Sequence, residues 1–422
     1  MTDVLVIGGG MAGAIAALSA RRRGASVLVA RRSLGATALS SGAIDVAPDP
    51  AAPSGDLRSQ LVDPEKAARE VARTRPHHPY AVLQDKLPRL MEALHFAAQQ
   101  LPGLIAAPLA INALLPSPLG TVKPCAMGQL SQVGADVSSL PAAVAVVQLT
   151  VNPAYDARLV ARGIESAARS LGRKLSATVI ESRYFHAIED ALRSPQELAE
   201  LLDRPGALED FARDLRPRLP AGVEALLFPP VFGRRAPGLV IKLSELLGGI
   251  RCAEILSEAP SVPGLRLQEA LDDALARERI ELLEAEVSCN AKAGVFTLGA
   301  TRVVEPKASV LATGKFIGGG IVREEEFREP LLNLPVYAGS RRLRGQHIGD
   351  LLAEDVRGDQ QAFRAGVRID ASLRPLGADG LPIHPRLYAA GSVISGYDPA
   401  ADKTGLGVAI FTGYLAGEAA GG

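Results

Sequence analysis

Short hydrophobic runs alternate with helix-like spacing at the start of the chain. Residues 4–7 are hydrophobic at every position and precede three glycines, which indicates a short, buried β-strand. Residues 13–23 follow with the Ala and Leu spacing of a helix, and Gly24 suits its C-terminal cap. A second hydrophobic run covers residues 26–29. The pattern therefore predicts a strand, a helix and a second strand, the β–α–β unit.

Similar patterns recur along the chain and become regular again from residue 265. They predict a discontinuous, Rossmann-like α/β domain at residues 1–75 and 265–422, with an inserted α+β domain at residues 76–264. Helices are expected at 83–100, from Asp156, twice within 195–216, at 265–277 and at 406–419; strands are expected at 142–149, 174–182, 224–228, 281–286, 294–298, 309–312 and 387–390.

Charge and cysteine content narrow the possible functions. The 46 basic and 46 acidic residues leave no net charge, which argues against binding to nucleic acid or an anionic membrane. The basic tract at residues 341–344 is interpreted as a solvated loop. Cys125, Cys252 and Cys289 are too scattered to ligate an iron–sulfur cluster, and each is expected to be a small buried residue. Without a signal-like start or an uncharged run of about 18 hydrophobic residues, we expect a cytoplasmic protein.

The glycines after the first strand have the spacing Gly-x-Gly-x-x-Gly. Gly8 permits a tight turn, Gly10 lets the backbone approach a phosphate, and Gly13 lets the helix pack closely on the strand. The helix N-terminus adds N–H groups and a partial positive charge. Because the motif stands between a strand and a helix, we interpret it as the phosphate site of a Rossmann-like FAD/NAD(P)-binding domain of the two-dinucleotide-binding type.

The end of the second strand departs from the usual pattern. An acidic side chain normally binds the adenosine ribose there, but the sequence reads Ala30-Arg31-Arg32 and offers no carboxylate. Arg31 either contacts the cofactor, through a phosphate or a stacked ring, or is a solvated loop residue. The missing acid leaves room for NADP, an unusual FAD pose or FMN; FMN is the preferred cofactor and FAD the alternative.

Loops of small residues suggest how the rest of the cofactor is held. Hydroxyl residues and glycine suit close passage of a diphosphate or a flavin ring, and the N-terminus of the last helix suits the charge of a reduced flavin. Asp398 either contacts a ribityl hydroxyl or caps a turn before Pro399. The candidate cofactor residues in these loops are Ser40, Ser41, Gly42, Thr313, Gly314, Gly391, Ser392, Asp398, Gly405 and Gly407.

The sequence does not identify a catalytic base, so the catalytic residues stay unassigned. His78, in a Pro-flanked loop, is the most interesting of the 6 histidines, but a structural role is favoured for it. No group of His, Cys, Asp and Glu has metal-ligand spacing, so no metal is expected.

Segments from one end of the chain to the other carry a family resemblance. They are Gly8–Gly13, Ser40–Asp45, His78–Tyr80, Pro118–Thr121, Pro263–Gln268, Ala312–Gly320, Arg328–Leu331, Ala390–Val393 and Gly396–Pro399. In these segments the chain resembles the B subunits of the anaerobic, quinone-linked glycerol-3-phosphate dehydrogenase. The glycine motif is generic, whereas the segments in the middle of the chain are far more specific.

The resemblance implies a role and a set of partners. It implies a protein that carries FMN and sits between an FAD-containing catalytic A subunit and an iron–sulfur C subunit. The complex oxidises sn-glycerol 3-phosphate to dihydroxyacetone phosphate and passes electrons to quinone. The chain would be cytoplasmic and peripheral on the inner face of the cell membrane, with membrane contact only through a partner. Lys403 departs from the glycine-rich loop expected of the family, and could neutralise a phosphate or reduced ring, or face water.

Two other functions stay open. A stand-alone FAD-dependent oxidoreductase of the fumarate-reductase-like group would have a closed basic substrate pocket in the inserted domain. A non-catalytic assembly subunit would keep only a vestigial flavin site. We favour the electron-transferring flavin subunit of the dehydrogenase.

Overall fold

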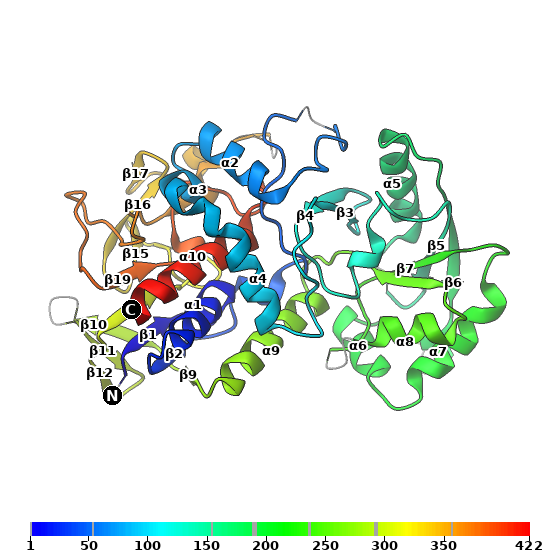
Figure 1. The fold of residues 1–422 in the computed structure, drawn as a ribbon, viewed down its shortest axis with the longest axis horizontal. Coiled ribbons are helices and arrows are strands. Elements are labelled where there is room, and N and C mark those ends of the chain that lie inside the picture. The colour runs from blue at the N-terminus through cyan, green and yellow to red at the C-terminus, as the bar shows by residue number, and fades with distance from the viewer. Residues whose placement is uncertain are drawn as a thin grey trace.

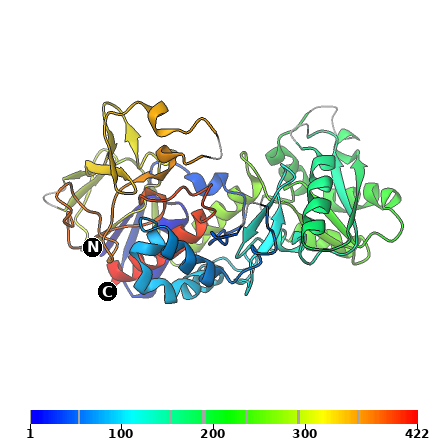
Figure 2. The same ribbon diagram turned by 90° about the horizontal axis from the view of Figure 1, so that it is seen from above.

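The computed structural model describes residues 2–52, 55–152, 155–187, 192–234, 238–290, 294–355 and 358–422. These residues form two lobes, a larger one that contains both chain termini and a smaller one at the other end (Figures 1 and 2). The β3–β4 hairpin (Ala113–Pro116 and Val122–Cys125) lies between them.

The larger lobe is built on a parallel five-stranded sheet assembled from both ends of the sequence. Its strand order is β19-β13-β1-β2-β9, with β1 in the centre. The expected β–α–β unit and the α/β fold are therefore confirmed. The strands are β1 (Val4–Ile7), β2 (Val27–Arg31), β9 (Glu281–Glu284), β13 (Ala308–Leu311) and β19 (Leu387–Ala389).

Both faces of this sheet are covered, which explains why β1 is hydrophobic at every position. Val4 and Val6 belong to the core formed with the helices, whereas Leu5 and Ile7 belong to a second core beneath an antiparallel sheet. Successive side chains of a strand point to opposite faces, so a strand covered on both faces needs no polar position. The antiparallel sheet consists of β10 (Val287–Asn290), β11 (Val295–Leu298) and β12 (Arg302–Val304).

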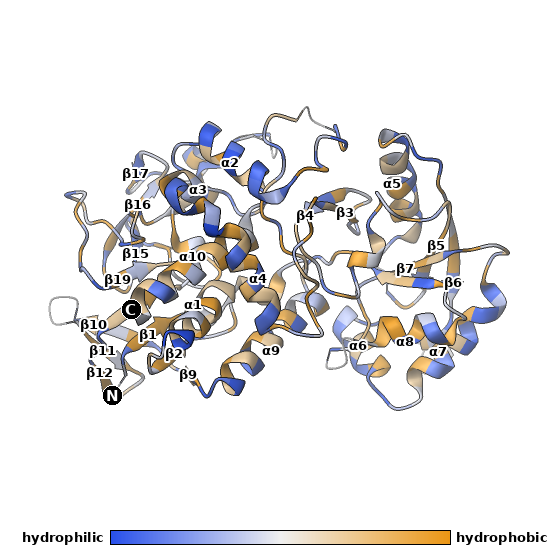
Figure 3. Ribbon diagram, in the orientation of Figure 1, coloured by the Kyte–Doolittle hydropathy of each residue, from blue (hydrophilic) through white to orange (hydrophobic). Residues whose placement is uncertain are grey.

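The helical face depends on close contact between the first and last helices. A Cβ at Gly413 would lie 2.4 Å from the Ala12 carbonyl oxygen, and one at Gly417 would lie 2.2 Å from that of Ala16, so the two backbones touch. Figure 3 shows hydrophobic residues along both helices. The helices of this lobe are α1 (Met11–Arg22), α2 (Pro64–Thr74), α3 (Pro79–Val82), α4 (Leu90–Gln100), α9 (Val262–Arg277) and α10 (Gly405–Gly421).

Helices α3 and α4 share the core of α1 and α10, although the sequence predicts that residues from 76 onward belong to the inserted domain. Tyr80, Leu94 and Phe96 are buried in that core. Burial of these side chains against α10 groups the helices with the larger lobe, so the observed second core begins further along the chain.

A third sheet of short antiparallel strands completes the larger lobe. The basic tract at residues 341–344 lies mostly in this sheet, so its interpretation as a solvated loop is wrong. The reason is that Leu343 is buried and pairs with Val336 across the sheet, while Arg341 remains exposed. The strands are β14 (Val322–Arg323), β15 (Phe327–Glu329), β16 (Leu334–Ala338), β17 (Arg341–Leu343) and β18 (Ala365–Gly366).

The smaller lobe is a parallel four-stranded sheet with the order β6-β5-β7-β8. Because helices connect successive strands, the strands run parallel, and the lobe is α/β where α+β was expected. Its strands are β5 (Ala143–Leu149), β6 (Ser176–Ser182), β7 (Ala225–Phe228) and β8 (Arg251–Glu254), and its helices are α5 (Ala157–Ser170), α6 (Pro195–Leu202), α7 (Ala207–Leu215) and α8 (Leu239–Leu246).

A buried ion pair joins the two lobes. Arg266 of α9 contacts Glu254 of β8 at 2.8 Å, and both side chains are at most 1% exposed. Gln129 and Ser131 also accept hydrogen bonds from Arg266. Removal of one partner would leave a buried charge unpaired, so this contact holds α9 against the smaller lobe.

The sequence predicts three buried cysteines and no segment that spans a membrane. Cys125 is buried as expected, whereas Cys252 and Cys289 are only partly buried. Burial raises the pKa of Cys252 to about 12 and that of Cys289 to about 11, so both are protonated, unreactive thiols at neutral pH. Among the described residues, no helix is long and apolar enough to cross a membrane.

Candidate functional site

The glycine turn between β1 and α1 is packed as the spacing predicts. Gly8 has a positive φ of 115°, and a Cβ there would lie 2.1 Å from the Ala312 carbonyl oxygen at the end of β13. A Cβ at Gly13 would lie 1.8 Å from the Gly8 carbonyl oxygen. Two of the three glycines are therefore required for the backbones of β1, α1 and β13 to meet.

Gly10 differs from the other two, because the space beside it is nearly free of protein. Among the residues that the structure describes, a Cβ there would meet only the Thr37 hydroxyl, at 3.1 Å. The same hydroxyl accepts a hydrogen bond from the Met11 N–H at 2.9 Å and so lies at the N-terminus of α1. An open glycine beside a helix N-terminus is a cradle that suits a phosphate group.

The loops after β13 and β19 come together next to this cradle. A Cβ at Gly314 would lie 3.7 Å from the Ser392 hydroxyl, and one at Gly391 would lie 2.6 Å from the Ala12 Cβ in α1. The Gly391 N–H donates to Thr412 of α10 at 2.8 Å. The structure thus brings together predicted site residues that are more than 300 positions apart in the sequence.

The Ser40–Gly42 segment is fixed by contacts with residues at the start of α9 and in the loop after β4. The Ser40 carbonyl accepts from the Ser261 hydroxyl at 2.6 Å, and the Ser41 carbonyl accepts from Gln132 at 2.9 Å. Gly42 has a positive φ of 88° and lies against Pro263. Contacts to its backbone therefore hold this loop in place.

Two buried hydroxyls indicate that the cradle suits a polar ligand. In the part of the chain that the structure describes, the Ser40 and Thr313 hydroxyl oxygens are buried and have no hydrogen-bond partner. A buried hydroxyl without a partner is unfavourable, and a phosphate or polyol chain would satisfy it. Together with the open Gly10, these hydroxyls fit a flavin nucleotide.

A cluster of charges surrounds the N-terminus of α10. The Asp45 carboxylate accepts a hydrogen bond from the Leu406 N–H at 3.2 Å and forms an ion pair with Lys123 at 2.9 Å. The backbone carbonyl of Asp45 accepts a hydrogen bond from the Gly407 N–H at 2.8 Å. Lys403 precedes the helix with a positive φ of 51°, a strained conformation that is often found at functional sites.

The second lysine makes this cluster positive. Burial lowers the pKa of Lys403, and the nearby Lys123 lowers it further. Burial also opposes the charge of Lys123, but Asp45 raises its pKa above the ordinary value. In the described part of the chain, two lysines and a helix N-terminus thus surround the Asp45 carboxylate, an arrangement that stabilises added negative charge. Gly405 and Gly407 lie at the start of α10, as predicted.

The interpretation of Arg31 as a solvated loop residue is wrong, whereas its contact with the cofactor stays a prediction. Its side chain is only 8% exposed and forms ion pairs with Asp272 at 2.8 Å and Glu284 at 3.0 Å. Gln268 donates to both Asp272 and the Gly9 carbonyl, so this network supports the glycine turn. The prediction that no carboxylate is available at the end of β2 is wrong as well, because α9 and β9 each supply one.

Asp398 and His78 both have local structural roles. Asp398 accepts from the Ala400 N–H at 2.9 Å and the Ala401 N–H at 3.1 Å, which is the turn-capping interpretation. His78 is fully buried, and its Nδ1 accepts from the Tyr80 N–H, so Nε2 is assigned as the donor to the Thr404 hydroxyl at 3.2 Å. Burial lowers the pKa of His78 well below its usual value, so it is neutral. Neither residue is placed to act as a base.

Sequence reasoning missed the residues whose roles depend on distant contacts. Thr37, Asp45 and Lys123 carry no motif of their own, although Asp45 ends the Ser40–Asp45 segment. Among the residues described, no group of three or more His, Cys, Asp or Glu side chains could hold a metal ion.

Comparison with known proteins identifies a family that the chain matches and several proteins that are similar to it. Residues 3–408 match the family model described as FAD binding domain. The chain is 32% identical to the probable B subunit of the anaerobic glycerol-3-phosphate dehydrogenase of Halobacterium salinarum, over 99% of this chain and 97% of that protein. It is 28% identical to the B subunit of the anaerobic glycerol-3-phosphate dehydrogenase of Pectobacterium carotovorum, over 97% and 96%. Among solved structures, the 3-ketosteroid Δ1-dehydrogenase of Sterolibacterium denitrificans aligns over 100% of this chain and 99% of that one, with a TM-score of 0.42 and 12% identity.

Proposed function

We propose that this chain is an electron-transferring flavin subunit. The proposal rests on its family, because the chain belongs to the FAD-binding domain family and to the B subunits of the anaerobic glycerol-3-phosphate dehydrogenase. In the proposed complex, sn-glycerol 3-phosphate is oxidised to dihydroxyacetone phosphate and electrons pass to quinone. The observation that carries the proposal is the open cradle at Gly10, which lies in a chain similar to these B subunits over almost its full length.

The residues of the cradle have distinct roles in this proposal. A bound flavin supplies the redox chemistry. Gly10 and the α1 N-terminus hold a phosphate, and the Ser40 and Thr313 hydroxyls donate to polar groups of the nucleotide. Lys403 and the N-terminus of α10 offset negative charge that develops on reduction.

We propose FAD as the flavin, although the sequence favours FMN. The preference for FMN depends on the absence of an acid at the end of β2, and Glu284 stands next to Arg31 at that point. The family description also names FAD. Both observations support an adenosine-containing cofactor.

Oxidation of glycerol 3-phosphate is assigned to a partner. His78, the most interesting histidine in the sequence, is buried and forms hydrogen bonds with Tyr80 and Thr404. The proposed partners are an FAD-containing catalytic A subunit and an iron–sulfur C subunit. In this arrangement the chain lies on the cytoplasmic face of the membrane and reaches it only through a partner.

Release and identification of the bound flavin tests this proposal. The purified chain is denatured with acid and the released flavin is separated by chromatography; one FAD per chain is expected, together with no oxidation of glycerol 3-phosphate by the chain alone. Bound FMN would overturn the choice of FAD but keep the role in electron transfer. Turnover of another substrate would support a stand-alone oxidoreductase, and a protein that stays colourless after incubation with either flavin would support an assembly role.

A further inference from the structure

A cavity lined by basic side chains lies apart from the flavin cradle. It has a volume of about 340 Å³ and lies between the turn that precedes α3, the β16–β17 hairpin and the segment 359–364. Arg75, His77, Arg341 and Arg364 line it, and Asp359 is its acidic lining residue. No residue that we assign to the flavin lines this cavity, so flavin binding does not account for it.

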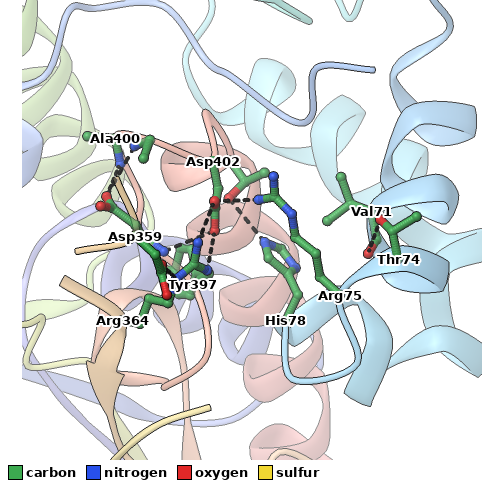
Figure 4. A network of polar contacts seen from close by, with 12 residues as sticks. Val71, Thr74, Arg75, His78, Asp359, Arg364, Tyr397, Ala400 and Asp402 are labelled. Atoms are coloured by element: carbon green, nitrogen blue, oxygen red, sulfur yellow. Dashed lines mark hydrogen bonds and ion pairs between the residues drawn. The ribbon is translucent and has the colours of Figure 1, made fainter. Parts of the chain in front are cut away.

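Two of the arginines are held in place by one buried carboxylate. Asp402 is 2% exposed, and it pairs with Arg75 on one side and with Arg364, at 3.2 Å, on the other (Figure 4). The Asp398 N–H also donates to Asp402, at 3.0 Å, which fixes the carboxylate. The guanidinium groups are thus oriented before any ligand arrives, which reduces the entropy lost on binding.

The third arginine contacts a neutral partner. Arg341 donates from Nη1 to the side-chain oxygen of Gln361 at 2.8 Å, so its charge is not neutralised by this contact. Arg364 also pairs with Asp359 at 2.6 Å. Among the described residues, three guanidinium groups therefore face two carboxylates, Asp359 and Asp402, and the cavity retains net positive charge.

The turn of the β16–β17 hairpin lies close to His77, and both line the cavity. Gly339 has a positive φ of 63°, and a Cβ there would lie 3.1 Å from the His77 ring. The turn thus rests against the loop before α3, with Arg341 of β17 beyond it. This brings groups from three separate segments around a space that suits a small anion.

We propose that this cavity binds a small phosphate-bearing anion, either inorganic phosphate or the phosphate of a monoester. Guanidinium groups donate in a planar fork that matches phosphate oxygens, and the excess positive charge needs an anion. The site is separate from the flavin cradle, because Asp402 faces the arginines whereas Lys403 belongs to the cluster with Asp45 and Lys123. The proposal holds whether or not the chain carries a flavin.

Titration calorimetry at constant ionic strength tests this assignment. Inorganic phosphate, glycerol 3-phosphate and glycerol are each titrated into the full chain and into the Arg341→Gln and Arg302→Gln variants. Arg302 is a matched control because it is also an exposed arginine. It forms an ion pair with Glu281 and lies on a different sheet from Arg341. Arg341→Gln is expected to weaken phosphate binding at least tenfold, with melting temperature and flavin content unchanged, and Arg302→Gln is expected to bind like the unaltered chain.

The outcomes separate the two sources of phosphate. Equal affinity for phosphate and glycerol 3-phosphate supports a site for free phosphate, and tighter binding of the ester supports a phosphorylated polyol. The proposal is overturned if the unaltered chain binds neither, if glycerol binds as tightly as its phosphate, or if Arg302→Gln weakens binding as much as Arg341→Gln. Because flavin content is measured on the same samples, loss of the flavin and loss of this site are distinguishable.

Discussion

Arg31 and Glu284 stand opposite each other on the neighbouring parallel strands β2 and β9, and their side chains form an ion pair at 3.0 Å. The acidic group expected at the end of β2 is thus supplied by another strand, and an arginine holds it there. Asp272 completes the network from α9. Because Gln268 links Asp272 to the Gly9 carbonyl, this arrangement makes Arg31 a support of the glycine turn.

Replacement of Arg31 by Gln is expected to lower the free energy of unfolding by about 1–3 kcal/mol, because Asp272 and Glu284 lose their charged donor. Denaturant unfolding measures this change. Arg302→Gln, which removes an exposed pair, should change it by less than about 1 kcal/mol. If both substitutions lowered the free energy of unfolding by the same amount, the ion pairs of Arg31 would stabilise the fold no more than an exposed surface pair does.

Replacement of Gly10 by Ala is expected to weaken flavin binding about tenfold or more and leave stability almost unchanged. The added methyl meets only the Thr37 hydroxyl within the protein, but it fills the space assigned to the phosphate. Equilibrium flavin binding and thermal unfolding are measured together. Gly35→Ala is the control, since a Cβ there meets nothing within 4 Å. Unchanged flavin affinity in Gly10→Ala would rule out the cradle.

Replacement of Lys403 by Gln is expected to lower the flavin midpoint potential on the order of 30 mV, which corresponds to about 1.4 kcal/mol for a two-electron couple. The reason is that a positive charge at the α10 N-terminus favours the reduced, more negative cofactor. A redox titration of the flavin-loaded chain measures the shift. As a control, Lys242→Gln removes an exposed lysine on α8 and should leave the midpoint potential unchanged. An unchanged potential in Lys403→Gln would contradict the role of Lys403 in stabilising the reduced flavin.

Glu329 predicts a pH dependence of stability between pH 4.5 and about 7. Burial raises the pKa of this carboxyl from 4.5 to about 7, against the opposing hydrogen bonds from the Leu332 and Leu331 N–H groups. The folded state therefore binds more protons in this range, and stability falls as the pH rises, by at most about 1.4 kcal/mol per pH unit. Glu329→Gln lacks this contribution, so its stability relative to the unaltered chain should rise from pH 5 to pH 8. A difference independent of pH would show that the pKa is not raised.

The sequence correctly predicts the elements whose signals lie in neighbouring residues. The strand at residues 4–7, the glycine turn and the helix that begins near Gly405 each depend on neighbouring residues, and the structure contains them. Helix α2 was missed, although Asp63 and Pro64 form a good helix start. The strands β14–β18 were missed because runs of two to five residues carry little periodicity.

The parts of the site that escaped prediction depend on contacts between distant residues. Glu284 is 253 positions from Arg31, and Arg364 reaches Asp402 across 38 positions. No pattern within one segment reveals such pairs. The glycine turn indicates a phosphate from the sequence alone, whereas the charge around α10 and the basic cavity emerge only from the fold.

Anaerobic reduction of the flavin shows whether the isolated chain oxidises glycerol 3-phosphate or only receives electrons from a partner. The FAD-loaded chain is mixed with glycerol 3-phosphate without oxygen, and the visible absorbance of the flavin is followed before and after addition of the catalytic A subunit. The absorbance is expected to stay constant with substrate alone and to bleach once the catalytic partner is present. Rapid bleaching by glycerol 3-phosphate in the isolated chain would overturn the proposed role, because the chain would then oxidise the substrate itself.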